Sequence, residues 1–215
     1  RYSDAELGYF KSGEFPFLYP NVDWINETFK NNGSSDIYNL TFRGGGERLR
    51  YYTNVNLISN LGFIAHPKEN SGYSTQNKYS KGSIRTNLDI DLTSTTKLMA
   101  NISGTLMEAS RPGLSSDDLW GKIYTVPAAA FPVKTEAGLW GGNTTWTGYY
   151  NPVALTEGRA YSKAHTRSLF ADMTLSQDLS AVTDGLSVWT RFAYDNIAAY
   201  WENHTREYKY GMDTA

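Results

Sequence analysis

Hydrophobic and polar residues alternate with a period of two along six stretches of this chain. The clearest stretch is Ile84–Leu92, where Ile84, Leu88, Ile90 and Leu92 alternate with Arg85, Asn87, Asp89 and Asp91. Successive side chains of a strand point to opposite faces, so this pattern predicts strands with one apolar and one polar face. The other stretches are Ile37–Gly44, Leu49–Ser59, Leu98–Leu106, Leu169–Ser176 and Leu186–Asp195.

Two architectures share this pattern. In a soluble antiparallel sheet the apolar face packs on a core, whereas in a membrane barrel it meets lipid and the polar face lines the lumen. Strand length separates the two, because a spanning strand needs roughly 9–11 residues and soluble strands centre on about 5–6. Most of the alternating stretches have the longer length. They favour a transmembrane β-barrel of about six to eight antiparallel strands, and a large soluble β-sandwich remains the alternative.

The connections between the strands are of two kinds. Arg43-Gly44-Gly45-Gly46-Glu47, Leu92–Lys97 and Asp184-Gly185 predict short turns, since glycine tolerates the left-handed conformations of tight turns. The segment 108–164 instead carries four prolines and many glycines, with no sustained alternation. Short turns on one side and long loops on the other are typical of outer-membrane barrels. We therefore expect 108–164 to be a long extracellular loop region within one barrel segment spanning 1–215.

Two short helices are expected among the loops. Asp23 is a candidate N-cap for Trp24–Lys30, with Asn31-Asn32-Gly33 as its end. Ser116 or Asp117 is a candidate N-cap for Leu119–Tyr124, which Pro127 would end.

Composition narrows the function classes. The mean hydropathy of −0.50 leaves no apolar run long enough for a membrane-spanning helix. The net charge of −2 argues against a nucleic-acid-binding protein, which normally shows a basic face. Because the chain has no cysteine, a disulfide scaffold, a Cys-ligated zinc site and a thiol nucleophile are excluded.

Several short motifs occur in an order that resembles a known family. They are Tyr19-Pro20-Asn21-Val22-Asp23-Trp24, the Arg43-Gly44-Gly45-Gly46 hairpin, the strand Tyr51–Asn56, Leu61-Gly62-Phe63, Arg85-Thr86-Asn87-Leu88-Asp89, Asn151-Pro152-Val153-Ala154, and Gly185-Leu186 before Tyr194-Asp195. The chain resembles the SusC/RagA family of TonB-dependent outer-membrane transporters of Bacteroidetes. Each motif is short, and their order from about Tyr2 to Tyr210 carries the resemblance.

The resemblance implies a fold, a location and partners. Members of that family import oligosaccharides or peptides across the outer membrane, with energy from TonB and with a SusD-like surface lipoprotein as a lid. Their fold is an N-terminal plug inside a 22-stranded barrel. Since no plug, TonB box or carboxy-terminal barrel strand is recognisable here, we expect a segment of the early barrel after the plug. It would contact outer-membrane lipid, and the missing plug region would contact TonB.

The histidines and serines of the chain lack the sequence context of a catalytic or metal site. His66, His165 and His204 lie far apart without an i, i+4 partner and are expected to be solvent or loop histidines. Ser103 and Ser168 lack the sequence context of a nucleophile elbow. We expect neither an enzyme nor a bound metal or cofactor.

Charged pairs and glycine runs have simpler interpretations than chemistry. Asp89 and Asp91 share one strand face, as a carboxylate pair or a Ca²⁺ site would require. Lumen polarity balanced by Arg85 and by neighbouring strands is the favoured explanation of both carboxylates. The glycine run Arg43–Gly46 lacks the Lys-Ser/Thr of a phosphate-binding loop, which favours a hairpin turn.

Aromatic residues of the long loop region are the candidate substrate contacts. They are Trp120, Trp140, Trp146, Tyr149 and Tyr150. Flat aromatic faces stack on sugar rings or pack against peptide side chains, but aromatics also pack loops together or form the girdle at a membrane interface. The sequence thus predicts part of a nutrient importer, and a secreted β-sandwich binding module with exposed aromatics remains the alternative.

Overall fold

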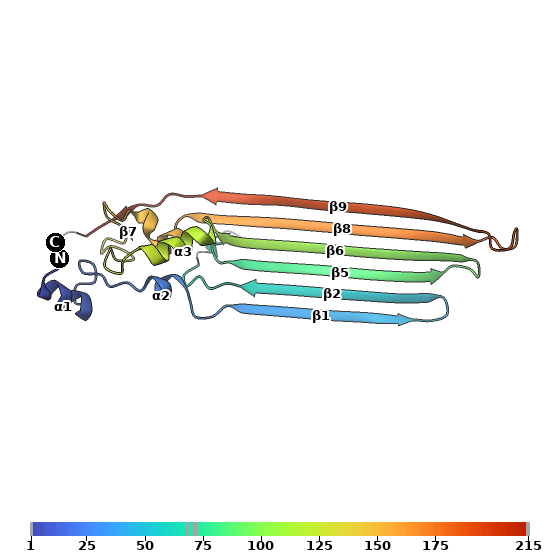
Figure 1. Ribbon diagram of the computed structural model, residues 1–215, viewed down its shortest axis with the longest axis horizontal. Helices are drawn as coiled ribbons and strands as arrows, with labels where there is room; N and C mark the ends of the chain where they lie inside the picture. The colour runs from blue at the N-terminus through green and yellow to red at the C-terminus, as the bar shows by residue number, and fades with distance from the viewer. Residues whose placement is uncertain (1, 68, 71–72, 214–215) are drawn as a thin grey trace.

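The computed structural model describes residues 2–67, 69–70 and 73–213, and its main feature is one long antiparallel sheet (Figure 1). Six strands are neighbours in the order β1-β2-β5-β6-β8-β9, and every neighbouring pair is antiparallel. They are β1 (Ser34–Gly45), β2 (Leu49–Leu61), β5 (Lys78–Asp91), β6 (Thr96–Pro112), β8 (Ala160–Asp178) and β9 (Ser187–Thr205). Among the described residues this sheet is open, with β1 and β9 at its edges.

Each of the six alternating stretches predicted from the sequence forms a strand, which confirms the antiparallel β-class. The strands are longer than the stretches, from 12 residues in β1 to 19 in β8 and β9. Ladder pairing continues beyond the alternating residues toward the ends with long connections. Because β6 runs to Pro112 and β8 begins at Ala160, the connection between them is 113–159 and not 108–164.

The strand register puts the predicted hydrophobic sets on one side of the sheet. One row across the sheet is Tyr38, Leu57, Gly82, Leu106 and Arg167. We call this side the apolar face, and it carries Leu40, Phe42, Leu49, Tyr51, Val55, Ile84, Leu88, Ile90, Leu98, Ala100, Ile102, Leu169, Ala171, Met173, Leu175, Val188, Phe192 and Tyr194. The opposite side, the polar face, carries Arg50, Asn54, Arg85, Asn87, Asp89, Asp91, Asn101, Asp172 and Arg191.

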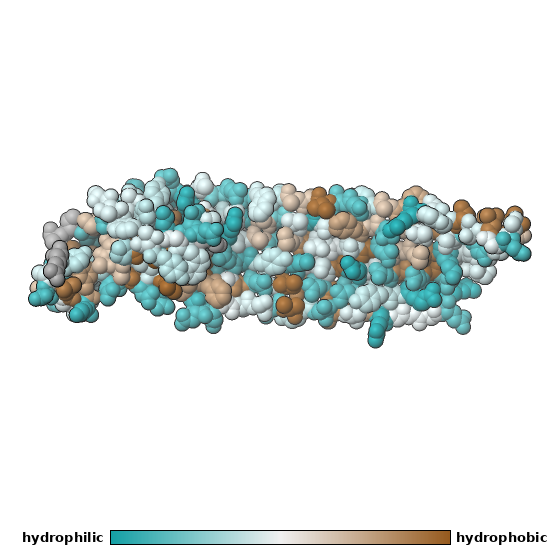
Figure 2. Space-filling model, in the orientation of Figure 1, coloured by the Kyte–Doolittle hydropathy of each residue, from teal (hydrophilic) through white to brown (hydrophobic). Residues whose placement is uncertain are grey.

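The hydrophobic core does not lie against the sheet. Its buried members are Trp24, Ile64, Leu119, Ile123, Val126, Phe131 and Val153, all from segments outside the six strands. These segments and both ends of the chain gather at one end of the sheet (Figure 1). The side chains of the apolar face are largely exposed. Leu106, for example, is 68% exposed and Ile84 is 46% exposed. Figure 2 shows hydrophobic and hydrophilic side chains together on the visible surface of the sheet.

Short helices and two small ladders complete the fold. The ladders join β3 (Glu69–Asn70) to β4 (Tyr73–Ser74) and β7 (Trp140–Gly141) to β10 (Tyr210–Gly211). The helices are α1 (Asp4–Ser12), α2 (Trp24–Thr28), α3 (Ser116–Thr125), α4 (Pro152–Glu157) and the 3₁₀ turn η1 (Gly148–Tyr150). In the described part of the chain, none of the helices has both the length and the apolar composition needed to cross a bilayer.

Helix capping agrees in part with the sequence. Asp23 caps α2 as predicted, and its carboxylate accepts hydrogen bonds from the N–H groups of Ile25 and Asn26. Helix α3 begins earlier than predicted, because Ser115 is its N-cap and not Ser116 or Asp117. Helices α1 and α4 are not among the predicted elements.

Candidate functional site

The segments at the core end of the sheet form one packed unit, which we call the loop cluster: residues 2–33, 62–67, 69–70, 73–77, 113–159 and 206–213. Backbone hydrogen bonds join its parts across long distances in the sequence. The N–H of Val22 donates to Ala128 over 3.0 Å, and the N–H of Ala65 donates to Thr28 over 2.9 Å. The indole of Trp24 donates to the carbonyl of Pro127. The loop cluster therefore has a fixed structure and positions its exposed side chains.

Asn151, from the Asn-Pro-Val-Ala motif, organises the centre of the loop cluster. Its buried amide donates to the carbonyl oxygens of Val133 at 2.9 Å and Gly141 at 3.1 Å. Its Oδ1 accepts a hydrogen bond from the N–H of Ala154, so that Asn151 also caps α4. The motif residue thus has a structural role here, since a buried carbonyl without a partner is costly.

Three of the five candidate aromatics pack inward. Trp140, Trp146 and Tyr150 are partly buried against the core of the loop cluster. The ammonium of Lys122 lies 3.9 Å from the ring centre of Tyr150, and that of Lys134 lies 4.4 Å from the ring of Trp140. These cation–π contacts and the burial give all three rings a role in packing the loops.

Trp120 and Tyr149 are the two candidates that remain open, with 41% and 44% of their surface exposed. Trp120 stacks on Tyr124 with the ring centres 5.7 Å apart and also contacts Phe29. Two flat, exposed rings on one helix form the kind of platform on which a sugar ring or an apolar side chain stacks. Whether either ring contacts a substrate stays a prediction.

Tyr149 belongs to a second aromatic group, formed with the C-terminal segment. Its hydroxyl donates to the carboxylate of Glu207 over 3.3 Å, and its ring contacts those of Tyr208 and Tyr210. The negative charge of Glu207 raises the pKa of Tyr149 above its ordinary value. Sequence reasoning missed Glu207, Tyr208 and Tyr210, although the alternating Tyr208-Lys209-Tyr210 offered a signal.

A hollow of about 820 Å³ opens on the loop cluster away from these aromatics. Charged side chains on its lining come from Asp23, Glu27, Lys134 and Glu157, beside the exposed His66. None of the five candidate aromatics lines it. Its polar rim and volume, within the roughly 300–1,000 Å³ of small-ligand sites, make it a second candidate for substrate contact.

On the polar face, opposite charges are paired across strands. Arg50 lies 4.0 Å from the carboxylates of both Asp89 and Asp91, and Lys97 lies 3.9 Å from Asp91. These cations come from the strands on either side, so the two carboxylates are part of an ion-pair ladder. Within the ranges that the structure describes, no group of three or more His, Asp or Glu side chains is placed to hold a metal ion.

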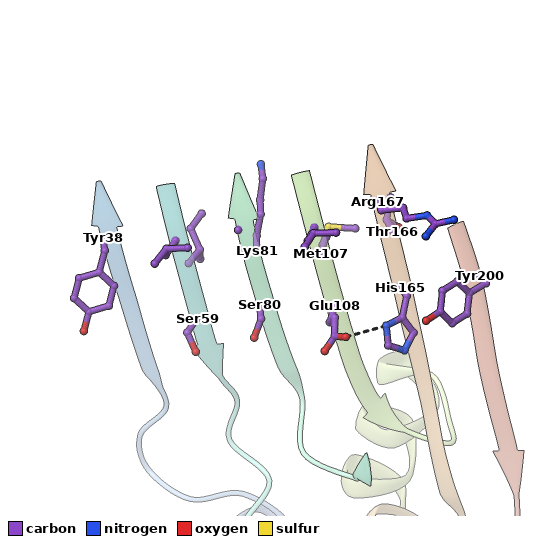
Figure 3. A pocket seen from close by; sticks show the side chains of 14 residues that line it. Tyr38, Ser59, Ser80, Lys81, Met107, Glu108, His165, Thr166, Arg167 and Tyr200 are labelled. Atoms are coloured by element: carbon purple, nitrogen blue, oxygen red, sulfur yellow. Dashed lines mark ion pairs between the residues drawn. The ribbon is translucent and has the colours of Figure 1, made fainter. Parts of the chain in front are cut away.

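His165 departs from the expectation that the histidines are solvent or loop residues. It lies within β8, its side chain is only 14% exposed, and its Nδ1 is 3.0 Å from Glu108 of β6 (Figure 3). The ring of Tyr200 stacks on it with the ring centres 4.5 Å apart. His204 also lies in a strand, where it stacks on Tyr161. The sequence could not show these partners because they come from neighbouring strands.

Glu108, His165 and Tyr200 stand beside a hollow of about 710 Å³ on the apolar face. The ammonium of Lys163 lies 3.9 Å from the carboxylate of Glu108. The hydrophobic side chains of Tyr38, Leu57 and Leu106 line the same hollow, so it combines apolar walls with a charged rim.

No family model and no curated protein matches the chain. The resemblance to the SusC/RagA family therefore rests on the short motifs. A proposal for the function has to rest on the geometry of the sheet and of the loop cluster.

Proposed function

We propose that this chain is a section of the wall of an outer-membrane β-barrel that imports a nutrient, with the loop cluster on the outside of the cell. One observation carries the proposal. Six long adjacent strands share one apolar face with largely exposed side chains, whereas the hydrophobic core lies in the loop cluster. A face of this kind suits a surrounding apolar solvent, which the acyl chains of a bilayer supply.

The height of the apolar band fits a bilayer. On β6 the band runs from Leu98 to Leu106. This stretch has nine residues, which reaches the roughly 9–11 residues that a tilted strand needs to cross a bilayer. Beyond Leu106 the same side of the sheet turns polar, with Glu108 on β6 and His165 on β8.

The polar face suits a hydrated lumen. Arg50, Asn54, Asn87 and Asp89 point to this side, and the ion pairs of Arg50 keep the charges balanced. In the proposed barrel these side chains tune the passage of a hydrophilic solute, and no residue acts as a catalyst.

The asymmetry of the connections supports the orientation. The turns 46–48, 92–95 and 179–186 all lie at one end of the sheet. The described residues of the connection between β2 and β5, and the connection 113–159, lie at the other end (Figure 1). Outer-membrane barrels have short periplasmic turns and longer extracellular loops. The proposal therefore places the loop cluster, including Trp120 and Tyr149, at the extracellular side.

The short motifs add the kind of transporter. Their likeness to the SusC/RagA family supports uptake of an oligosaccharide or a peptide, energised by TonB through a plug and covered by a SusD-like lipoprotein. In this proposal the exposed rings of Trp120 and Tyr149 contact the substrate or the lid.

A secreted β-sandwich binding module is the second candidate. The described sheet has two open edges, as the sheets of a sandwich do. A second sheet packed on the apolar face would also cover its exposed hydrophobic side chains. The two candidates differ in what covers that face, which is lipid in one and protein in the other.

Accessibility of single cysteines on intact cells tests the proposal, since the chain has no cysteine of its own. In the full-length protein, Thr144→Cys in the loop cluster and Ser94→Cys in a short turn are treated with a membrane-impermeant maleimide. We expect labelling of Thr144→Cys on intact cells and of Ser94→Cys only after the outer membrane is permeabilised. Release of the protein into the medium, or equal labelling of both variants on intact cells, contradicts the proposal.

A further inference from the structure

Two glycines in the middle of the sheet have no local structural reason to be glycine. Gly82 of β5 and Gly104 of β6 both belong to the apolar face. Neither has a positive φ. A Cβ at Gly82 would lie 3.5 Å from Leu57, and one at Gly104 would lie 3.7 Å from Ile84, which is ordinary contact. Glycine inside a strand costs stability, and it marks a bulge, a tight bend or a place where a ligand or another backbone approaches closely. The register is continuous through both positions, which leaves the bend and the close approach.

The missing side chains leave a groove in the apolar face. A hollow of about 390 Å³ contains both glycines, and it adjoins the hollow of about 710 Å³ described above. The two share Leu57, Gly82 and Leu106 as lining residues. The groove thus runs between hydrophobic walls toward the polar rim of the sheet.

An unpaired cation stands beside the groove. Arg167 lines the larger hollow, in the same row of the sheet as Gly82 and Leu106 (Figure 3). The neighbouring carboxylate of Glu108 is already contacted by His165 at 3.0 Å and by Lys163 at 3.9 Å. The structure gives Arg167 no ion pair with any of the residues that it describes. The larger hollow therefore offers a free guanidinium, which prefers phosphate or carboxylate partners.

We propose that this groove binds one anionic, phosphate-bearing lipid of the bilayer, with an acyl chain over Gly82 and Gly104 and the headgroup phosphate against Arg167. Charge complementarity identifies the occupant, because an apolar groove with a free cation beside it matches an apolar chain that carries an anion at its end. Tyr38 and Tyr200 line the larger hollow, and their amphipathic rings are suited to the headgroup level of a membrane. The inference rests on the proposed function, since it requires the apolar face to contact lipid.

Quenching by brominated lipids tests the site in the full-length protein. A bimane fluorophore is attached at Leu169→Cys, which pairs with Gly104, and as a control at Leu175→Cys, near the turn end of the same face. The protein is reconstituted in phosphatidylcholine nanodiscs that contain a minor fraction of either dibrominated phosphatidylglycerol or dibrominated phosphatidylcholine. At Leu169 we expect the anionic lipid to quench with about five-fold higher apparent affinity, the ratio that one cation near a membrane surface produces. At Leu175 we expect no difference.

Two variants locate the site. Arg167→Gln removes the cation, and Gly104→Leu fills the groove without a demand on φ. Each is expected to abolish the preference at Leu169, whereas Arg167→Lys is expected to retain part of it. Equal quenching by the two lipids at Leu169, or a preference that survives both variants, overturns this inference and leaves the barrel wall intact. Absence of quenching by either lipid at both positions overturns the proposed function itself.

Discussion

The side-chain amide of Gln76 satisfies both backbone hydrogen-bonding groups of Ile64. It donates to the carbonyl oxygen of Ile64 at 2.9 Å and accepts from its N–H at 3.0 Å. Both residues are buried, and Ile64 also forms an isolated bridge with Phe29 beside α2. This pairing ties the connection between β2 and β5 to the core of the loop cluster.

Removing this amide is expected to loosen the loop cluster while the strands remain. Gln76→Ala leaves two buried backbone groups of Ile64 without partners, at a cost of about 1–3 kcal/mol each. Hydrogen exchange of the full-length protein should show faster exchange at Ile64 and its neighbours. Gln177→Ala is the matched control, because two of the hydrogen bonds of Gln177 lie at the exposed end of β8, where water replaces them. If Gln76→Ala speeds hydrogen exchange at Ile64 no more than Gln177→Ala does, the contact between Gln76 and Ile64 does not stabilise the loop cluster.

Trp120 and Trp146 are expected to respond differently to the same substitution. Trp146→Ala removes a ring packed against the core and should destabilise the loop cluster by roughly 3 kcal/mol, the low end for buried tryptophan. Trp120→Ala removes an exposed ring and should leave the melting temperature nearly unchanged while it weakens substrate binding. Thermal denaturation and calorimetric titration with the transported substrate measure the two effects. Unchanged affinity of Trp120→Ala removes this ring from the substrate contacts.

The contact between Tyr149 and Glu207 predicts a pH dependence at the alkaline end. Since the carboxylate of Glu207 raises the pKa of Tyr149, the contact is fully stabilising below the ordinary tyrosine pKa. Its contribution is lost as the pH rises through the raised value. Glu207→Gln should return the pKa of Tyr149 toward its ordinary value, which ¹³C NMR of the labelled tyrosine ring detects. A titration unaffected by Glu207→Gln would contradict the contact.

The sequence predicted the six strands because their signal is local. Alternation in Ile84–Leu92 reports which side chains share a face, and the register places them there. Asp23 was equally readable, because a cap depends on the residues directly after it. The ends of β6 and β8 could not be predicted from the sequence, because the ladder hydrogen bonds continue past the last alternating residue.

The candidate site was predicted less well because its contacts are distant in sequence. His165 is enclosed by Glu108 and Tyr200, which lie on the neighbouring strands. Tyr149 meets Glu207 only through the packing of the C-terminal segment on the loop cluster. The sequence shows that aromatic residues are present in 113–159. Which of them point inward depends on how the segment packs against the buried core residues, and these come from distant parts of the chain.

The central claim is that one face of the sheet contacts lipid and the other contacts water. A scan along β6 tests it most directly, with single cysteines labelled by bimane at Leu98, Met99, Ala100, Asn101, Ile102 and Ser103 of the full-length protein in membranes. We predict that brominated lipid quenches the label at Leu98, Ala100 and Ile102, and that aqueous iodide quenches it at Met99, Asn101 and Ser103. Absence of this alternation, or protection of Leu98, Ala100 and Ile102 from both quenchers, would contradict the account and favour a protein-covered sandwich.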